Sequence, residues 1–143
     1  MDRQIQELAA LALAARANAY TPYSHFSVGA ALLTLAGEVY TGCNIENAAY
    51  TPTNCAERTA FFKAVSEGER SFAAIAIAGG KEGELPASFC APCGVCRQVM
   101  MEFCDPRSFV IILVKGDGQR DSDYKTYTLK QLFPEGFGPD NLS

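Results

Sequence analysis

Apolar and polar positions follow two different periods along the chain, and these periods predict where helices and strands lie. Residues 3–18 place Ile, Leu and Ala at helical spacing, which predicts an amphipathic helix. Residues 26–35 and 38–45 favour β structure and are separated by Ala36-Gly37, which predicts a β-hairpin. Helical and extended patterns therefore both occur within the first 45 residues.

Two later segments, 72–78 and 109–114, are apolar throughout, as is typical of strands buried on both faces. Between them, a loop over 81–91 leads to a helix for which Pro92 suits the first position. A strand, a helix and a strand in this order predict a parallel pair joined by a right-handed crossover.

One more helix and one more strand complete the predicted elements. Asn54 is a plausible N-cap, with Glu57 three residues later, for a helix that runs to about Ser66. Residues 124–129 are expected to form a last short strand. This order predicts a mixed sheet covered by helices, an α/β sandwich, and residues 1–143 are expected to form a single domain.

Composition and charge narrow the possible partners. The chain has 143 residues, is 48% hydrophobic and carries a net charge of −4, with no basic stripe. Proteins that bind polyanions normally show such a stripe, so we expect a small-molecule substrate and no nucleic acid. Six cysteines in a chain with ample apolar residues indicate thiols in a reducing compartment more than a disulfide framework.

The N-terminus and the absence of long apolar runs bear on location. Residues 8–15 are apolar and Ala17-Asn18-Ala19 resembles a leader cleavage site, but Asp2 and Glu7 spoil the basic region that a leader requires. No run approaches the roughly 18 apolar residues of a membrane span. We therefore expect a cytoplasmic protein with no membrane partner.

Three cysteines and one glutamate carry the candidate chemistry. The segment Cys55-Ala56-Glu57 is followed, 38 positions after its cysteine, by Pro92-Cys93-Gly94-Val95-Cys96. Three thiolates suit a zinc ion and leave its fourth tetrahedral position for water, whose proton a carboxylate such as Glu57 can move. This Cys-x-Glu and Pro-Cys-x-x-Cys combination is the known three-cysteine form of the zinc-deaminase signature. The chain is thus expected to be an enzyme.

The predicted helices support this site. Cys55 and Cys93 each fall at a helix start, where the partial positive charge favours a thiolate. Three thiolates overcompensate the charge of Zn²⁺, and Arg58 and Arg97, each beside a ligand, are candidates to hydrogen-bond the sulfurs. The alternative is that both are ordinary surface arginines.

Two other metal sites remain as alternatives. Cys90, Cys93 and Cys96 have the spacing that opens an iron–sulfur run, although Cys104 comes too late to complete it. A closed structural zinc site would need a fourth protein ligand, and its candidates are the remaining cysteines and one histidine. These candidates are Cys43, Cys90, Cys104 and His25.

Four segments together resemble cytidine deaminases of the short, homotetrameric kind. They are Pro22 to Ala31, Gly42 to Ala48, Cys55 to Arg58, and Pro92 to Gln98, and the likeness extends to Leu132 to Phe137. The resemblance covers nearly the whole chain in the right order. It implies a three-layer α/β/α sandwich with a mixed five-stranded sheet. His25 and Val95 depart from the residues that are usual in the family.

The resemblance also implies roles for individual residues. Zinc, one ion per subunit, would be held by Cys55, Cys93 and Cys96, with Glu57 as the proton shuttle. The remaining positions would bind substrate. Asn44 and Glu46 would bond the ribose hydroxyls, Phe26 would stack on the pyrimidine and the Ala56 N–H would contact the base carbonyl, while Ala48, Tyr50 and Phe137 would complete a neighbouring subunit's pocket.

The implied reaction is hydrolytic deamination of cytidine and 2′-deoxycytidine to uridine or deoxyuridine and ammonia, in pyrimidine salvage. Three other functions are weighed against it. A blasticidin-type deaminase shares the zinc motifs, but Asn44-Ile45-Glu46-Asn47 favours a nucleoside. A polynucleotide-editing deaminase needs basic grooves. A zinc-stabilised interaction module would unfold on chelation and show no activity.

Overall fold

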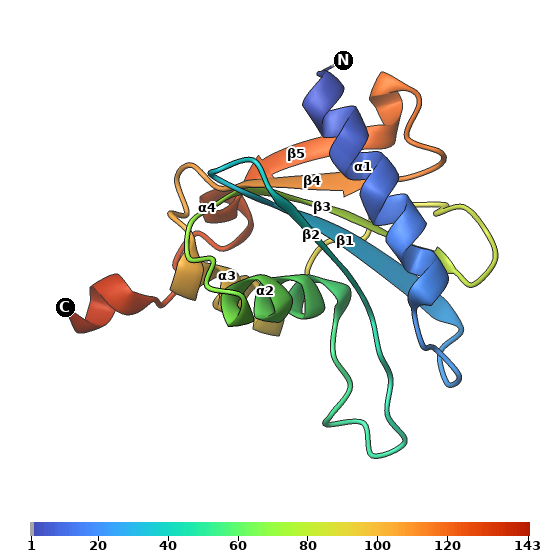
Figure 1. The fold of residues 1–143 in the computed structure, drawn as a ribbon, viewed down its shortest axis with the longest axis horizontal. Coiled ribbons are helices and arrows are strands. Elements are labelled where there is room, and N and C mark those ends of the chain that lie inside the picture. The colour runs from blue at the N-terminus through green and yellow to red at the C-terminus, as the bar shows by residue number, and fades with distance from the viewer. Residues whose placement is uncertain (1) are drawn as a thin grey trace.

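The computed structural model describes residues 2–143 and contains a five-stranded sheet with helices on both faces (Figure 1). The strands are β1 (Phe26–Thr34), β2 (Val39–Cys43), β3 (Phe72–Lys81), β4 (Val110–Val114) and β5 (Tyr124–Thr128). The helices are α1 (Arg3–Ala15), α2 (Ala56–Ser66), α3 (Gly94–Phe103) and α4 (Leu129–Leu132). Short 3-10 turns cover Arg16–Asn18, Asp121–Asp123 and Pro139–Leu142.

The sheet is mixed, with the strand order β2-β1-β3-β4-β5. The central strand β3 pairs antiparallel with β1 and parallel with β4, and the remaining pairs are antiparallel. The predicted parallel pair is therefore confirmed. It explains why residues 72–78 of β3 and all of β4 are apolar, because both strands have helices or loops over their two faces.

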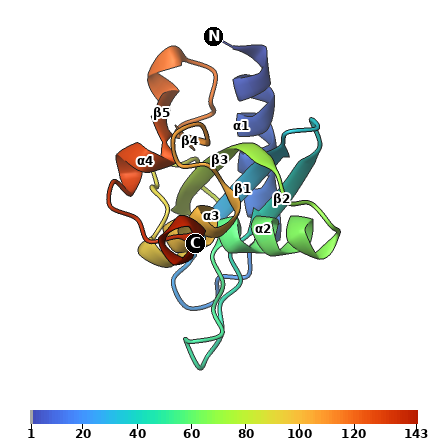
Figure 2. The same ribbon diagram turned by 90° about the vertical axis from the view of Figure 1, so that its left-hand side faces the viewer.

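Two separate apolar cores lie on the two faces of the sheet, which confirms the three-layer arrangement (Figures 1 and 2). On one face, Leu8, Ala9 and Ala12 of α1 pack on the sheet. On the other, α2 and α3 pack around the fully buried Phe61 and Met100. The metal-site motifs both belong to this second layer.

Glycines let the helices approach the sheet closely. A Cβ on Gly42 in β2 would lie 2.4 Å from the Ala56 carbonyl oxygen and 2.5 Å from the Ala60 nitrogen. A Cβ on Gly29 in β1 would lie 2.0 Å from the Ala12 carbonyl oxygen. Each helix backbone thus rests directly on a strand, and Gly42 fixes the depth at which α2 begins.

Several predicted boundaries are wrong by a few residues. Asn54 is not the cap of α2, because Cys55 occupies the N-cap, and the Asn54 amide instead donates to the Thr59 hydroxyl at 3.2 Å. Pro92 precedes the N-cap of α3, which is Cys93, so the first helical residue is Gly94. Both shifts place a cysteine at the cap itself.

Strand β3 also continues to Lys81, three residues beyond the apolar run 72–78 that predicted it, and these residues include Gly79 and Gly80. Gly79 and Gly80 pair with Val28 and Ser27 of β1, so they belong to the ladder. Within residues 2–143, no helix combines the length and apolar character that crossing a bilayer requires.

Candidate active site and metal centre

Three cysteine sulfurs converge at the point where α2 and α3 begin. The ligand atoms of Cys55, Cys93 and Cys96 all lie within 4.8 Å of one another, and the Sγ atoms of Cys55 and Cys93 are 3.7 Å apart. Tetrahedral zinc with Zn–S bonds of about 2.3 Å separates its sulfurs by roughly 3.8 Å. The spacing therefore fits one zinc ion, as the sequence predicted.

The two helix N-termini suit anionic ligands. Cys55 and Cys93 are the N-caps of α2 and α3, and neither side chain makes the usual hydrogen bond to its own helix. Both sulfurs are thus available to a metal, while the partial positive charges of the helix ends favour the thiolate forms.

Arg58 stabilises negative charge on the sulfurs. Its guanidinium donates a hydrogen bond to the Cys55 Sγ at 3.2 Å, as expected from its place beside a ligand. Its Nε is buried without an acceptor in the described part of the chain. Hydrogen bonds from Cys96 and then from Arg58 lower the pKa of Cys55 to about 5. Such a thiol is ionised at neutral pH, which metal binding requires.

Arg97 does not act on the sulfurs, and that expectation is corrected here. Its Nε donates to the Pro92 carbonyl oxygen at 2.8 Å and its Nη1 to the Leu132 carbonyl oxygen at 2.6 Å. The guanidinium therefore ties the segment before Cys93 to the chain after α4. Its effect on the metal centre is to hold the backbone of a ligand in place.

Glu57 lies in the first turn of α2 and is 5% exposed. Burial, together with the nearby Cys55 thiolate, raises the pKa of its carboxyl to about 7. A carboxyl with this pKa can both accept and release a proton near neutral pH, as a general acid–base requires. The burial also keeps bulk water from competing for its proton.

The alternative metal sites are not supported. Within residues 2–143, the only group of three or more His, Cys, Asp or Glu side chains placed to hold an ion is Cys55, Cys93 and Cys96. Cys90 and Cys104 lie outside it, so neither an iron–sulfur run nor a fourth cysteine ligand forms. The His25 ring instead faces Glu82, with Nδ1 3.4 Å from Oε2.

The predicted sugar-binding residues occupy the end of β2 and the loop that follows. The Asn44 side chain accepts from the Val28 N–H at 2.8 Å and donates to the Phe26 carbonyl at 2.9 Å. An amide has further donor and acceptor capacity beyond these two bonds. Asn44 therefore fixes the start of β1, including Phe26, whose side chain is 40% exposed.

Glu46 is engaged by the turn before β1, an arrangement that sequence reasoning missed. Its carboxylate accepts from the backbone N–H groups of Tyr23 and Ser24 at 3.0 and 3.1 Å, and from the Ser24 hydroxyl. These bonds, that from the Ser24 hydroxyl first, lower its pKa, so the group remains anionic. In the sequence, the only feature that indicated this turn was the occurrence of Pro22 and Ser24 shortly before Phe26.

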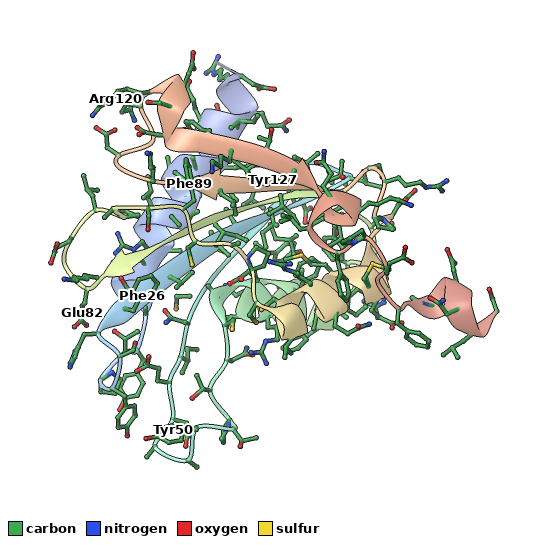
Figure 3. All side chains as sticks on the ribbon, turned by 180° about the vertical axis from the view of Figure 1, so that it is seen from behind. Phe26, Tyr50, Glu82, Phe89, Arg120 and Tyr127 are labelled. Atoms are coloured by element: carbon green, nitrogen blue, oxygen red, sulfur yellow. The ribbon has the colours of Figure 1, made fainter. Side chains whose placement is uncertain are left out.

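The loop that carries Ala48 and Tyr50 leads away from the helices that carry the cysteines (Figure 3), whereas the Phe137 carbonyl accepts a hydrogen bond from Gln98 of α3 at 2.8 Å. Ala48 and Tyr50 lie in the long loop after β2, which extends away from the body (Figures 1 and 3). Tyr50 is 77% exposed and Phe137, in the C-terminal tail, is 54% exposed. Ala56 is fully buried, and its N–H belongs to the first turn of α2, which has no acceptor within the helix.

Comparison with protein families supports the site. The profile described as "Cytidine and deoxycytidylate deaminase zinc-binding region" matches residues 2–112 of this chain. A cytidine deaminase of Sporosarcina psychrophila is 49% identical over 139 residues, which cover 97% of this chain and 95% of that protein. A cytidine deaminase of Halalkalibacterium halodurans is 46% identical over 143 residues, which cover 100% and 99%.

Solved structures agree with these relatives. The crystal structure of cytidine deaminase from Burkholderia pseudomallei aligns with a TM-score of 0.80 and 43% identity, covering 96% of this chain and 100% of that one. The cytidine deaminase from Mycobacterium tuberculosis aligns with a TM-score of 0.77 and 36% identity, covering 96% and 99%. Fold and sequence similarity thus extend over nearly the full length of both proteins.

Proposed function

Because the chain belongs to the cytidine and deoxycytidylate deaminase family, we propose that it converts cytidine and 2′-deoxycytidine to uridine and deoxyuridine, with release of ammonia. The observation that carries this proposal is the buried Glu57 carboxyl beside three convergent cysteine sulfurs. A buried carboxyl with a raised pKa beside a metal site is typical of a general acid–base.

Zinc held by Cys55, Cys93 and Cys96 would supply, when bound, the Lewis acidity that makes water nucleophilic at neutral pH. Glu57 accepts the proton of the attacking water and delivers it to N3 of the pyrimidine. Water oxygen adds to C4, and Glu57 then takes the remaining proton from that oxygen and passes it to the amino group, so that ammonia leaves and the C4 carbonyl forms. The pKa of Glu57, about 7, suits a group that must exchange protons twice in one cycle.

The remaining predicted residues bind substrate in this proposal. Phe26 stacks on the pyrimidine, and its 40% exposed ring has a free surface for this contact. The Ala56 N–H at the start of α2 donates to the C2 carbonyl. Asn44 is bonded to β1 and Glu46 to the turn before it, and each binds the ribose hydroxyls with its remaining hydrogen-bonding capacity. A contact to the 3′-hydroxyl serves both sugars.

We also propose that the protein is a homotetramer with shared active sites, each holding one zinc ion. The exposed Tyr50 and Phe137, together with Ala48 on the extended loop, support this because they gain a function only when a neighbouring chain is present. Light scattering would give the mass in solution. Tyr50→Ala is expected to raise KM without loss of zinc, whereas a fully active monomer would contradict the shared site.

The proposed setting is pyrimidine salvage in the cytoplasm, with small nucleosides as the only partners. A net charge of −4 gives no support for a polynucleotide substrate. Incubation of the zinc-loaded protein with a single-stranded oligonucleotide that contains cytosine is therefore expected to leave the cytosines unchanged.

The decisive test is release of uridine and ammonia from cytidine by purified, zinc-loaded protein, with Glu57→Ala run alongside. Turnover by the wild type and none by the variant would support both the reaction and the role of Glu57. No turnover by a folded, zinc-loaded wild type would contradict the proposal, and the antibiotic blasticidin would then be the next substrate tested.

A further inference from the structure

Cys90 lies against the predicted stacking residue and has no role in the mechanism above. A Cβ built on Gly79 of β3 would lie 2.9 Å from the Cys90 Sγ and 3.1 Å from Cε1 of the Phe26 ring. The Cys90 thiol and the edge of the Phe26 ring therefore both border the same backbone position, that of Gly79. Gly79 has to lack a side chain because these two groups fill the space above it.

The thiol also lies close to the metal centre in the chain. Cys90 is three residues before the ligand Cys93, and the charges that act on its thiol come from Glu57, Cys55 and Cys93. Burial, reinforced by these negative charges, raises the pKa of Cys90 to about 11. At neutral pH it is thus an uncharged, compact group and contributes to the pocket through its size.

The residue before Cys90 is held on another part of the sheet. The Phe89 ring has the Lys115 ammonium 5.0 Å from its centroid and the Lys125 ammonium 4.9 Å from it. Both distances lie within the range of cation–π attraction. Figure 3 shows Phe89 beside the outer strands and Phe26 near the start of β1. The loop that carries Cys90 is therefore fixed on both sides.

The proposed chemistry already gives one half of the pyrimidine ring its protein contacts. The C2 carbonyl faces the Ala56 N–H, N3 faces Glu57 and C4 faces the metal centre, while N1 carries the sugar. The edge that remains is C5 and C6, and C5 is the neighbour of C4 on the side opposite N3. Cys90 borders Gly79 together with Phe26, lies three residues before the ligand Cys93, and is used by none of these contacts.

We propose that Cys90 is a specificity-determining residue that faces the C5 edge of the pyrimidine and sets how large a 5-substituent the site accepts. This inference rests on the proposed function. Neither the Gly79 backbone behind Cys90 nor the anchored Phe89 can move to make room. The size of the Cys90 side chain therefore determines whether a 5-substituent as small as a methyl group fits.

The test compares kcat/KM for 5-methylcytidine with that for cytidine in three proteins. Cys90→Ala is expected to raise the ratio of 5-methylcytidine to cytidine about tenfold, because it removes a volume close to that of the added methyl. Cys90→Val is expected to lower the ratio by a similar factor. The control is Cys104→Ala, a buried cysteine at the far end of α3, which should leave the ratio at its wild-type value.

A second readout does not depend on turnover. The affinity of uridine and 5-methyluridine for the same proteins, measured by calorimetry, should change in the same order as the kinetic ratio. If the wild type turns over cytidine but the kcat/KM ratio of 5-methylcytidine to cytidine is the same in the wild type and in all variants, this inference alone is overturned. A wild type that neither deaminates cytidine nor binds uridine would overturn the proposed function, and the assignment of Cys90 with it.

Discussion

Arg58 donates a hydrogen bond to the sulfur of Cys55 from one turn further along the same helix, at 3.2 Å. This contact is local in sequence, so it forms whenever the first turn of α2 forms. It places a permanent positive charge beside a site that would hold three thiolates and one divalent ion. The excess negative charge of such a centre is thereby reduced without a fourth protein ligand.

The first prediction concerns this arginine. Arg58→Gln should lower the affinity for zinc by about 10- to 100-fold, because it removes a charge-assisted hydrogen bond to a ligand. Competition with a chromogenic chelator would measure the affinity. Arg107→Gln is the matched control, since Arg107 is exposed and pairs only with Asp105. Equal affinities in the two variants would contradict the role of Arg58.

The second prediction separates the proton shuttle from the metal site. Glu57→Gln should lower kcat by at least about a thousandfold, because the amide cannot carry the proton that the reaction moves twice. Zinc content measured by atomic absorption should stay at one ion per chain. A variant that keeps a tenth of the wild-type rate would disprove the assignment, and Glu67→Gln, at the exposed C-cap of α2, provides the control.

The third prediction uses pH dependence in the chelated, metal-free protein. Folding raises the pKa of Glu57 from 4.5 to about 7, so the folded state binds more protons than the unfolded state between these values. The contribution of Glu57 is therefore fully present below about pH 4.5 and is lost as pH rises towards 7. Cys55 works in the opposite direction, because folding lowers its pKa.

A comparison of wild type with Glu57→Gln isolates the Glu57 contribution, because Cys55 is present in both proteins. Relative to the variant, the wild type should lose about 3 kcal/mol of unfolding free energy between pH 4.5 and pH 7. Urea unfolding at several pH values would measure it. If the difference in unfolding free energy between the two proteins is the same at all these pH values, burial does not shift the pKa of the Glu57 carboxyl.

The fourth prediction concerns the close approach of α2 to the sheet. Gly42→Ala should destabilise the protein by about 2–3 kcal/mol and weaken zinc binding, because the new methyl would displace the backbone at Ala56. Gly94→Ala is the control. A Cβ there meets no atom within 4 Å, so unfolding in urea should show unchanged or slightly higher stability.

The fifth prediction is on metal removal. Chelation should abolish deamination reversibly and lower Tm, since an ion that binds only the folded state stabilises it by mass action. The far-UV circular dichroism spectrum and cooperative melting should persist, because two apolar cores on the sheet are formed without the metal. Complete unfolding on chelation would instead favour a module whose zinc serves only to fold it.

Much of the fold follows from short-range patterns. All five strands and the three longer helices lie where the apolar pattern indicates, because helical spacing and continuous apolar runs both depend on nearby residues alone. The errors fall at Asn54, Gly79-Gly80 and Pro92, where a residue with a strong local preference was overruled. Glycines often end strands, but here Gly79 and Gly80 pair with β1. Cys90 fills the space where a Gly79 side chain would lie, and Pro86 does the same at Gly80.

The metal ligands were predictable because their spacing is a chemical requirement, whereas the partners of long side chains were not. Arg58 and Arg97 both lie in the first turns of helices that begin at a ligand, yet in the described chain only Arg58 is hydrogen-bonded to a sulfur. The carbonyl of Leu132 that binds Arg97 is 35 residues away in sequence. Such a contact depends on the strand order, which local patterns do not specify, and the same is true of Glu46 and its bonds to the preceding turn.

The placement of β3 between the two halves of the metal centre has a consequence for how the protein folds. Cys55 begins the helix before β3 and Cys93 begins the helix after it, so 38 residues separate the sulfurs along the chain. Closing so long a loop is slow and entropically costly unless β1, β3 and β4 have already paired. The complete three-sulfur set is thus expected to form late in folding, so that zinc binds only chains whose sheet has already paired.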